Sequence, residues 1–115
     1  MKARIKHNQK VIAEDVLLAT TLHTRLVGLM FGSSPPQNSK GLLLNPCNSI
    51  HTCFMRYALD IVFLSADNKV VKIIHNIRPW RMTWIYFKAS KTLELPAGDL
   101  SKEVKEGDYL EVENV

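Results

Sequence analysis

Short runs in which apolar and polar residues alternate cover most of the chain, and this pattern predicts strands. Residues 3–7 and 10–13 form two such runs around Asn8 and Gln9, which predicts a hairpin that residues 16–19 extend. Further runs, rich in β-branched or aromatic residues, predict strands at 41–44, 49–55, 61–65, 70–74, 92–95 and 109–112. We therefore expect six to eight strands.

Two places favour a helix instead. Leu22, Leu26 and Leu29 repeat at helical spacing behind Thr20 or Thr21, either of which can cap a helix at its start. Residues 97–103 follow a strand that Pro96 stops, and they have room for one helical turn. One or two short helices are therefore expected among the strands.

The predicted fold class is α+β, dominated by a mostly antiparallel sheet that curls toward a barrel to hide its edges. The hairpin at 61–74 supports antiparallel pairing, because residues 66–69 form a tight turn in which Asn68 suits a left-handed conformation. No repeat or linker divides the sequence. Residues 1–115 are expected to form a single domain.

Composition narrows the class of protein. The 115 residues are 46% hydrophobic and 23% charged, which is typical of a soluble globular protein, and no apolar run is long enough to cross a membrane. We expect no membrane association. The first sixteen residues contain no continuous apolar segment of the kind that a secretory signal needs, so a cytoplasmic location is expected.

Charge is distributed unevenly. The net charge is +4, yet residues 68–93 contain no acid and six basic residues, whereas residues 94–113 contain seven of the eleven acids. Such a polarity can steer a negatively charged partner toward the basic part. The ordinary alternative is a solvated loop next to an acidic tail.

The segment 46–64 contains both cysteines of the sequence, together with a histidine, a methionine, an arginine and an aspartate. If residues 49–55 are extended, His51, Cys53 and Met55 project from one face and Ile50 and Thr52 from the other. Cys47 and His51 could hold zinc or copper(I). Because buried free cysteines are common, we expect core residues here, with no metal or cofactor, and keep a metal site at Cys47 and His51 as the alternative.

An enzyme is a second alternative for the same pair. Cys47 would act as the nucleophile and His51 as its base, with Asp60 or Glu94 orienting the imidazole. A cysteine and a histidine four residues apart also occur by chance, so whether the protein is an enzyme stays open at this point.

Four polar residues stand inside otherwise apolar motifs: Arg25, His51, Asp60 and Glu94. A charge in such surroundings must be paired or must face a cleft, since burying it alone is very unfavourable. The four could line a pocket in which Arg25 holds a small anionic ligand. Alternatively, Arg25 forms an internal ion pair with Asp60 or Glu94.

The stretch from residue 77 to residue 88 alternates cations with aromatic residues. Aromatic side chains interleaved with cations are typical of proteins that bind single-stranded nucleic acid. Arg78-Pro79-Trp80-Arg81 could equally be a loop in which Trp80 closes the core. We expect this second arrangement because the sequence has no recognised nucleic-acid motif.

Six motifs, in this order and spacing, resemble the domain of unknown function 192 family: TRLVGLMF at 24–31, GLLL at 41–44, SIHTCFM at 49–55, LDIVFL at 59–64, LELPAG at 93–98 and GD at 107–108. The resemblance implies a compact β-rich prokaryotic domain, often found behind a signal peptide, with no agreed substrate, cofactor or protein partner. We therefore expect a ligand-binding or accessory module.

Overall fold

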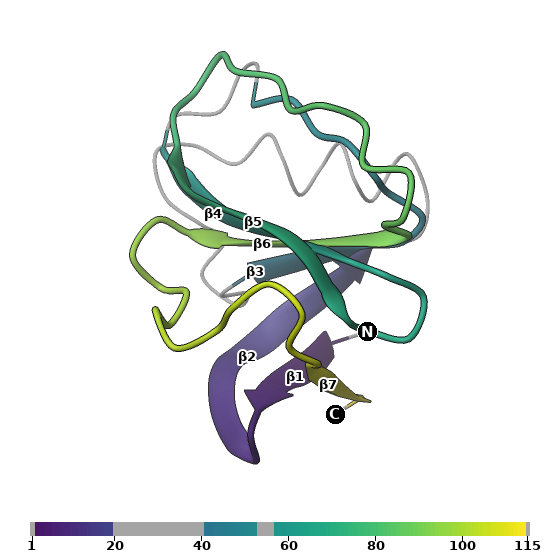
Figure 1. Cartoon of the computed structure of the whole chain (residues 1–115). Coiled ribbons are helices and arrows are strands. Elements are labelled where there is room, and N and C mark those ends of the chain that lie inside the picture. Colours follow the sequence, from purple (N-terminus) through teal and green to yellow (C-terminus); the bar gives the residue numbers. More distant parts are fainter. Residues whose placement is uncertain (1, 20–40, 53–56, 115) are drawn as a thin grey trace.

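The computed structural model describes residues 2–19, 41–52 and 57–114. They form one sheet of seven strands in the order β5-β4-β6-β3-β2-β1-β7 (Figure 1). The strands are β1 (Lys2–His7), β2 (Lys10–Ala19), β3 (Gly41–Leu44), β4 (Leu59–Leu64), β5 (Val70–Ile77), β6 (Lys91–Pro96) and β7 (Glu111–Asn114). The prediction of a β-dominated fold is confirmed.

The sheet is open, and its edges are β5 and β7. Strands β2 and β3 pair in parallel, whereas the other neighbouring strands pair antiparallel. Between the two edges runs the segment 108–110, in which the Val70 amide donates to the Asp108 carbonyl and the Leu110 amide donates to the Asn68 carbonyl. The C-terminal segment thus contacts the start of β5 before it pairs with β1.

Both predicted hairpins are confirmed, and their turns use left-handed residues. Asn8 and Gln9 have φ angles of 51° and 68° between β1 and β2, and Asn68 has a φ of 68° between β4 and β5. Asparagine tolerates this conformation better than most residues, and two successive left-handed residues match the twist of a two-residue hairpin.

Two predicted elements differ from the structure. Residues 97–103 form turns rather than a helical turn, because Gly98 has a φ of 94° and its amide, like that of Leu100, donates to a buried carboxylate on β4 instead of to a helical carbonyl. Residues 49–52 contain an isolated bridge and no strand. The helix expected near Leu22, and Cys53 and Met55, lie outside the described residues.

Alternating side chains of the sheet build two buried clusters, one on each face. Val62 and Leu64 of β4 join a cluster with Ile5, Val16 and Leu100, which we call the hairpin-side cluster. The intervening residues of β4 join the other cluster, on the side of segments 48–52 and 80–86, which together we call the ribbon. The members of this ribbon-side cluster are Leu42, Leu44, Cys47, Ile50, Leu59, Ile61, Phe63, Ile77 and Ala89. Because β4 is buried on both faces, it is apolar at nearly every position.

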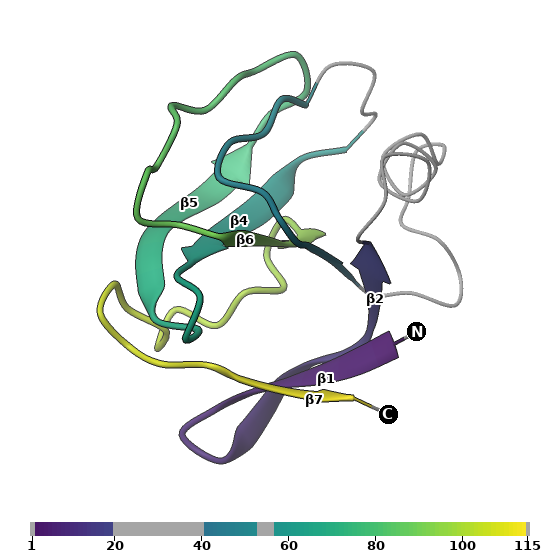
Figure 2. The same cartoon turned by 90° about the vertical axis from the view of Figure 1, so that its right-hand side faces the viewer.

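Segments 45–52 and 78–90 lie at one end of the molecule, and β1 and β7 lie at the other (Figures 1 and 2). Among the residues that the structure describes, no helix is long and apolar enough to cross a membrane.

Candidate functional site

The site is built on two segments outside the sheet that pair with each other. The Thr83 amide donates to the Ile50 carbonyl at 2.9 Å, and the Tyr86 amide donates to the Asn48 carbonyl at 2.9 Å. At the other end of the pairing, the Thr52 amide donates to the Arg81 carbonyl at 2.8 Å. Residues 48–52 and 80–86 thus pair to form the ribbon.

Two threonines stabilise the ribbon from within. Thr52 is completely buried, and its hydroxyl donates to the Arg78 carbonyl at 2.7 Å while it accepts from the Arg81 amide at 2.8 Å. The Thr83 hydroxyl accepts from the Ile50 amide at 2.9 Å. These hydroxyls supplement the backbone pairing where residues 78–83 are irregular, and they join the two segments to each other.

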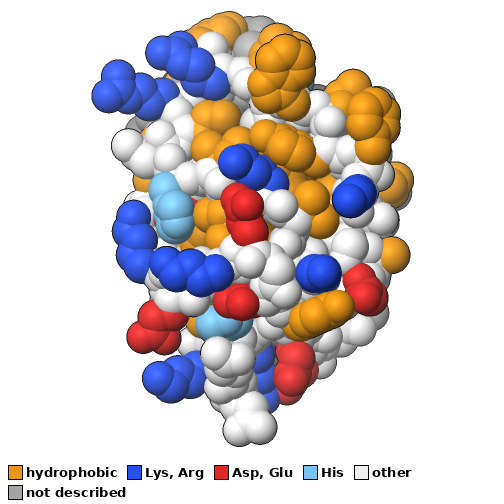
Figure 3. All heavy atoms as spheres, in the orientation of Figure 1, with side chains coloured by type: hydrophobic (Ala, Val, Ile, Leu, Met, Phe, Trp, Pro, Cys, Tyr) orange, Lys and Arg blue, Asp and Glu red, His pale blue; other side chains and the backbone are white. Residues whose placement is uncertain are grey.

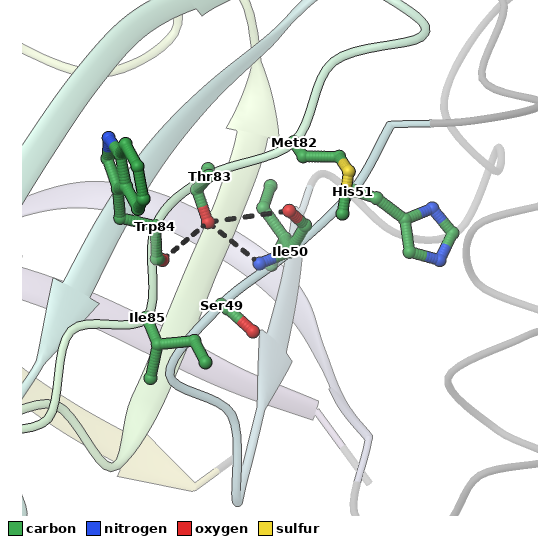
Figure 4. Close-up of a pocket in the computed structure, with 7 residues that line it drawn as sticks. All are labelled: Ser49, Ile50, His51, Met82, Thr83, Trp84 and Ile85. Carbon is green, nitrogen blue, oxygen red and sulfur yellow. Dashed lines mark hydrogen bonds between the residues drawn. The ribbon is translucent and has the colours of Figure 1, made fainter.

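A hollow of about 620 Å³ opens beside the ribbon. Its lining comes from both segments: Ser49, Ile50, His51, Met82, Thr83, Trp84 and Ile85. In the close-up, Thr83 points toward Ile50, while Trp84 and His51 point to opposite sides of the paired segments (Figure 4). The hollow therefore combines a largely apolar wall with an imidazole, two hydroxyls and backbone polar groups.

Large apolar side chains of the ribbon face water. The exposed fractions of Met82 and Trp84 are 80% and 84%, and that of Phe87, just after the ribbon, is 87%. Trp80 is exposed as well, at 60%, so the prediction that the tryptophan of the loop 78–81 closes the core is wrong. The core position is taken by Tyr86, whose ring lies 4.7 Å from that of buried Phe63.

Cations stand close in the sequence to these apolar side chains. Arg78, Arg81 and Lys88 are exposed, and the described residues contain no carboxylate that forms an ion pair with them. In Figure 3, hydrophobic side chains gather at the end where Figure 1 places residues 78–90, whereas acidic side chains lie across the middle and lower part of that face. The ribbon end is thus both apolar and positively charged.

Cys47 and His51 are in different environments. Cys47 is buried, its Sγ donates to the Ser49 carbonyl at 3.1 Å, and it lines a separate hollow of about 450 Å³ with Ala89 and Ser90. His51 is exposed at the larger hollow. No group of three histidines, cysteines or acids in the described ranges is arranged to hold a metal ion. The metal and nucleophile hypotheses for this pair stay predictions.

Asp60 organises the backbone of its surroundings. It is 2% exposed, and its Oδ1 accepts from the Asn76 amide at 2.9 Å. Its Oδ2 accepts from the amides of Gly98 and Leu100 at 2.9 and 3.1 Å. His75 Nδ1 lies 3.8 Å from Oδ1. Three backbone donors therefore stabilise the buried carboxylate.

Glu94 lies on the other face of the sheet. It is 4% exposed and pairs across the sheet with Ile61 and Leu42, both members of the ribbon-side cluster. Half-buried Tyr57 contacts that cluster, and burial raises the pKa of its hydroxyl above the ordinary value of 10.0, with the negative charge of Glu94 raising it further. Tyr57 and Glu94 therefore interact electrostatically on the ribbon side of the sheet.

Three of the four predicted ligand-binding residues lie in the described part of the chain, and they do not converge on one site. Asp60 follows the pattern of Val62 and Leu64 and faces the hairpin-side cluster, whereas Glu94 faces the ribbon-side cluster. His51 lines the hollow, and Arg25 lies outside the described residues.

Sequence reasoning did not anticipate that Met82 pairs with His51 or that Trp84 lines the same hollow. The sequence did indicate that side chains alternate along residues 50–52, and in the structure His51 is exposed while Ile50 and Thr52 are buried. This alternation did not reveal which segment pairs with residues 48–52, because Pro79 interrupts the strand pattern of the partner segment.

Comparison with known proteins gives the fold and the family. A crystal structure of a protein of unknown function from Novosphingobium aromaticivorans superposes with a TM-score of 0.76 at 21% identity, over 96% of this chain and 84% of that one. A protein from Sinorhizobium meliloti, described as a "putative transcription regulator", gives a TM-score of 0.73 at 22% identity, over 96% and 92% of the two chains. Identities at this level support a shared fold alone.

No curated protein matches the sequence. The family model DUF192, described as "Uncharacterized ACR", matches residues 3–112. This match covers nearly the whole sequence and agrees with the resemblance seen in the motifs. The chain belongs to the DUF192 family.

Proposed function

We propose that this domain is a binding module whose site is the hollow beside the ribbon. The ligand is small and negatively charged, and it carries a planar apolar part. Of the residues predicted to bind a ligand, the proposal retains His51 and assigns architectural roles to Asp60 and Glu94.

One observation carries the proposal: the ribbon exposes its large apolar side chains around a hollow instead of burying them. Single exposed apolar residues are common on protein surfaces. Here Met82, Trp84 and Ile85 are exposed together, and all three line the same concave site. An apolar hollow with a few polar groups at its wall is the usual form of a small-molecule site.

The charges around the hollow favour an anion. Arg81 belongs to the ribbon, Arg78 and Lys88 flank its second segment, and residues 68–93 contain no acid. A negatively charged group near the rim would gain a favourable interaction from these cations, while the planar part of the ligand would cover Trp84 and Met82. His51 and Thr83 offer hydrogen-bonding groups that can orient the ligand.

The proposal is tested with 8-anilinonaphthalene-1-sulfonate, which combines a planar apolar body with one negative charge. We expect saturable binding of about one molecule to the folded protein, measured by the increase in dye emission. N-phenyl-1-naphthylamine has the same rings without the sulfonate, and we expect it to bind more weakly.

Two variants locate the dye. Trp84→Ala removes the main apolar wall and is expected to weaken dye binding about tenfold. Tyr109→Ala is the control: it removes an aromatic ring that is also exposed but lies outside the hollow, and it should leave dye binding unchanged. Equal affinities for wild type and Trp84→Ala, with both proteins folded by circular dichroism, would contradict the proposal.

A further inference from the structure

We infer that the ribbon end binds single-stranded nucleic acid, with one base in the hollow and neighbouring bases on the aromatic side chains outside it. The inference uses the hollow of the proposed function for one base. It also uses a surface that the proposed function does not need.

Three aromatic side chains provide stacking surfaces along one short segment. Trp80, Trp84 and Phe87 have exposed fractions of 60%, 84% and 87%. Of these, Trp84 lines the hollow, whereas Trp80 and Phe87 lie outside it. Unpaired bases stack on exposed aromatic rings regardless of sequence, because every base has a π-face.

Three cations lie along the same segment as the aromatic residues. Arg78 precedes Trp80, Arg81 follows it, and Lys88 follows Phe87. Between residues 16 and 93 the sequence has only two acids, Asp60 and Asp67. Asp60 is buried, and Asp67 lies in the turn between β4 and β5. Phosphates along a nucleic-acid strand would therefore meet positive charge close to Trp80 and Phe87.

A bilayer surface could also attract an apolar and basic loop, but two features favour single-stranded nucleic acid. Arg81 lies in the sequence between Trp80 and Met82, so insertion of those side chains into lipid would bring the guanidinium with them, which is unfavourable. In addition, Met82 and Trp84 line a hollow, and a concave site fits a base better than it fits a lipid surface.

A duplex is a poor partner for this surface. Its bases are stacked within the helix and offer no free faces to Trp80, Trp84 or Phe87, and the described residues include no helix that could enter a groove. The expected partner is therefore unpaired DNA or RNA with little sequence preference.

The test measures the anisotropy of fluorescein-labelled twelve-nucleotide dT and rU strands with increasing protein. Because three cations are available, we expect the logarithm of the binding constant to fall with the logarithm of the salt concentration with a slope of about −2. A duplex of the same length should bind at least tenfold more weakly.

Matched variants separate this surface from the hollow. Phe87→Ala is expected to weaken strand binding about 5- to 150-fold while binding of the anionic dye is unchanged, since Phe87 does not line the hollow. Arg81→Gln should reduce the salt slope by about 0.7, whereas Lys102→Gln, an exposed cation in the acidic C-terminal part, should leave it unchanged.

The outcomes are distinguishable. Dye binding without nucleic-acid binding at low salt overturns this inference and leaves the proposed function standing. Nucleic-acid binding without dye binding supports this inference and overturns the proposed function. Co-sedimentation with phosphatidylcholine and phosphatidylglycerol vesicles that depends on Trp84, without strand binding, also overturns the inference in favour of a membrane. Equal strand affinities for wild type and Phe87→Ala, both folded by circular dichroism, contradict it as well.

Discussion

The sheet and the ribbon differ in which side chains they bury and which they expose. In the sheet, apolar residues such as Phe63 and Leu93 are completely buried, and the buried carboxylate of Asp60 accepts three backbone hydrogen bonds. In the ribbon, the polar threonines Thr52 and Thr83 form the internal hydrogen bonds, and large apolar side chains face water. The sheet is organised for stability, whereas the ribbon presents a surface.

The charges show the same contrast. At the end that holds β1 and β7, Lys6 lies 2.7 Å from Glu113, and His7 Nε2 lies 2.9 Å from Asp108 Oδ2. At the ribbon end, no described carboxylate forms an ion pair with an arginine or lysine of residues 78–88. Charges at the first end are already matched within the molecule, whereas those at the ribbon are available to a partner.

The contrast is tested most directly by one substitution made in both regions. Phe63→Ala should lower the free energy of unfolding by about 3–5 kcal/mol, because it leaves a cavity in the ribbon-side cluster. Phe87→Ala should change it by less than about 0.5 kcal/mol, because the ring is 87% exposed. Urea unfolding followed by circular dichroism measures both, and similar losses would break the comparison.

Removing the buried carboxylate should have the next largest effect. Asp60→Ala leaves the amides of Asn76, Gly98 and Leu100 without their acceptor, and we expect a loss of about 2–4 kcal/mol in the same urea experiment. Asp99→Ala, an exposed carboxylate in the adjoining turn, is the control and should change stability little. A small loss for Asp60→Ala would show that water can replace the carboxylate.

The hydroxyl that anchors the ribbon should matter less to global stability. Thr52→Val keeps the shape of the side chain but removes the bonds to Arg78 and Arg81, so we expect a loss of about 1–2 kcal/mol. Hydrogen exchange of the Arg81 amide should become faster than exchange in β4. Thr52→Ser retains the hydroxyl and should restore the protection, and failure of this rescue would locate the anchor elsewhere.

The smallest expected effect concerns pH at the end of the molecule away from the ribbon. Hydrogen bonding from the Lys105 amide, together with the nearby His7, holds the pKa of Asp108 below its ordinary value of 3.8. The ionised form therefore stabilises the fold above pH 3.8, and this contribution disappears as the pH falls through the lower folded-state pKa.

Urea midpoints of wild type and Asp108→Asn measured from pH 7 down to pH 2 test this expectation. Wild type should be the more stable at neutral pH, and the difference should shrink only in the acidic range. A difference that does not change with pH would mean that shape, rather than charge, is what Asp108 contributes.

The elements that follow local rules were predictable from the sequence. The turns at Asn8-Gln9 and Asn68 and the apolar runs of β4, β5 and β6 each depend on residues close together in the chain. The architecture of the site depends on pairing between residues 48–52 and 80–86, about thirty residues apart, and alternation within one segment cannot identify its partner.

Asp60 shows a different limit of prediction. Its position in an apolar motif correctly indicated a buried charge that needs partners, and side-chain partners or a cleft were the expected solutions. The structure uses backbone amides of residues 76, 98 and 100, and every residue except proline carries such a group. A side-chain pattern therefore contains no signal for this solution.

The placement of the two tryptophans has a practical consequence. The chain contains only Trp80 and Trp84, and both are exposed on the ribbon. Intrinsic tryptophan emission therefore reports on the ribbon end and is nearly blind to the core. Unfolding should shift the emission maximum little, because both indoles already contact water, whereas any molecule that covers the ribbon should shift it to the blue without a label.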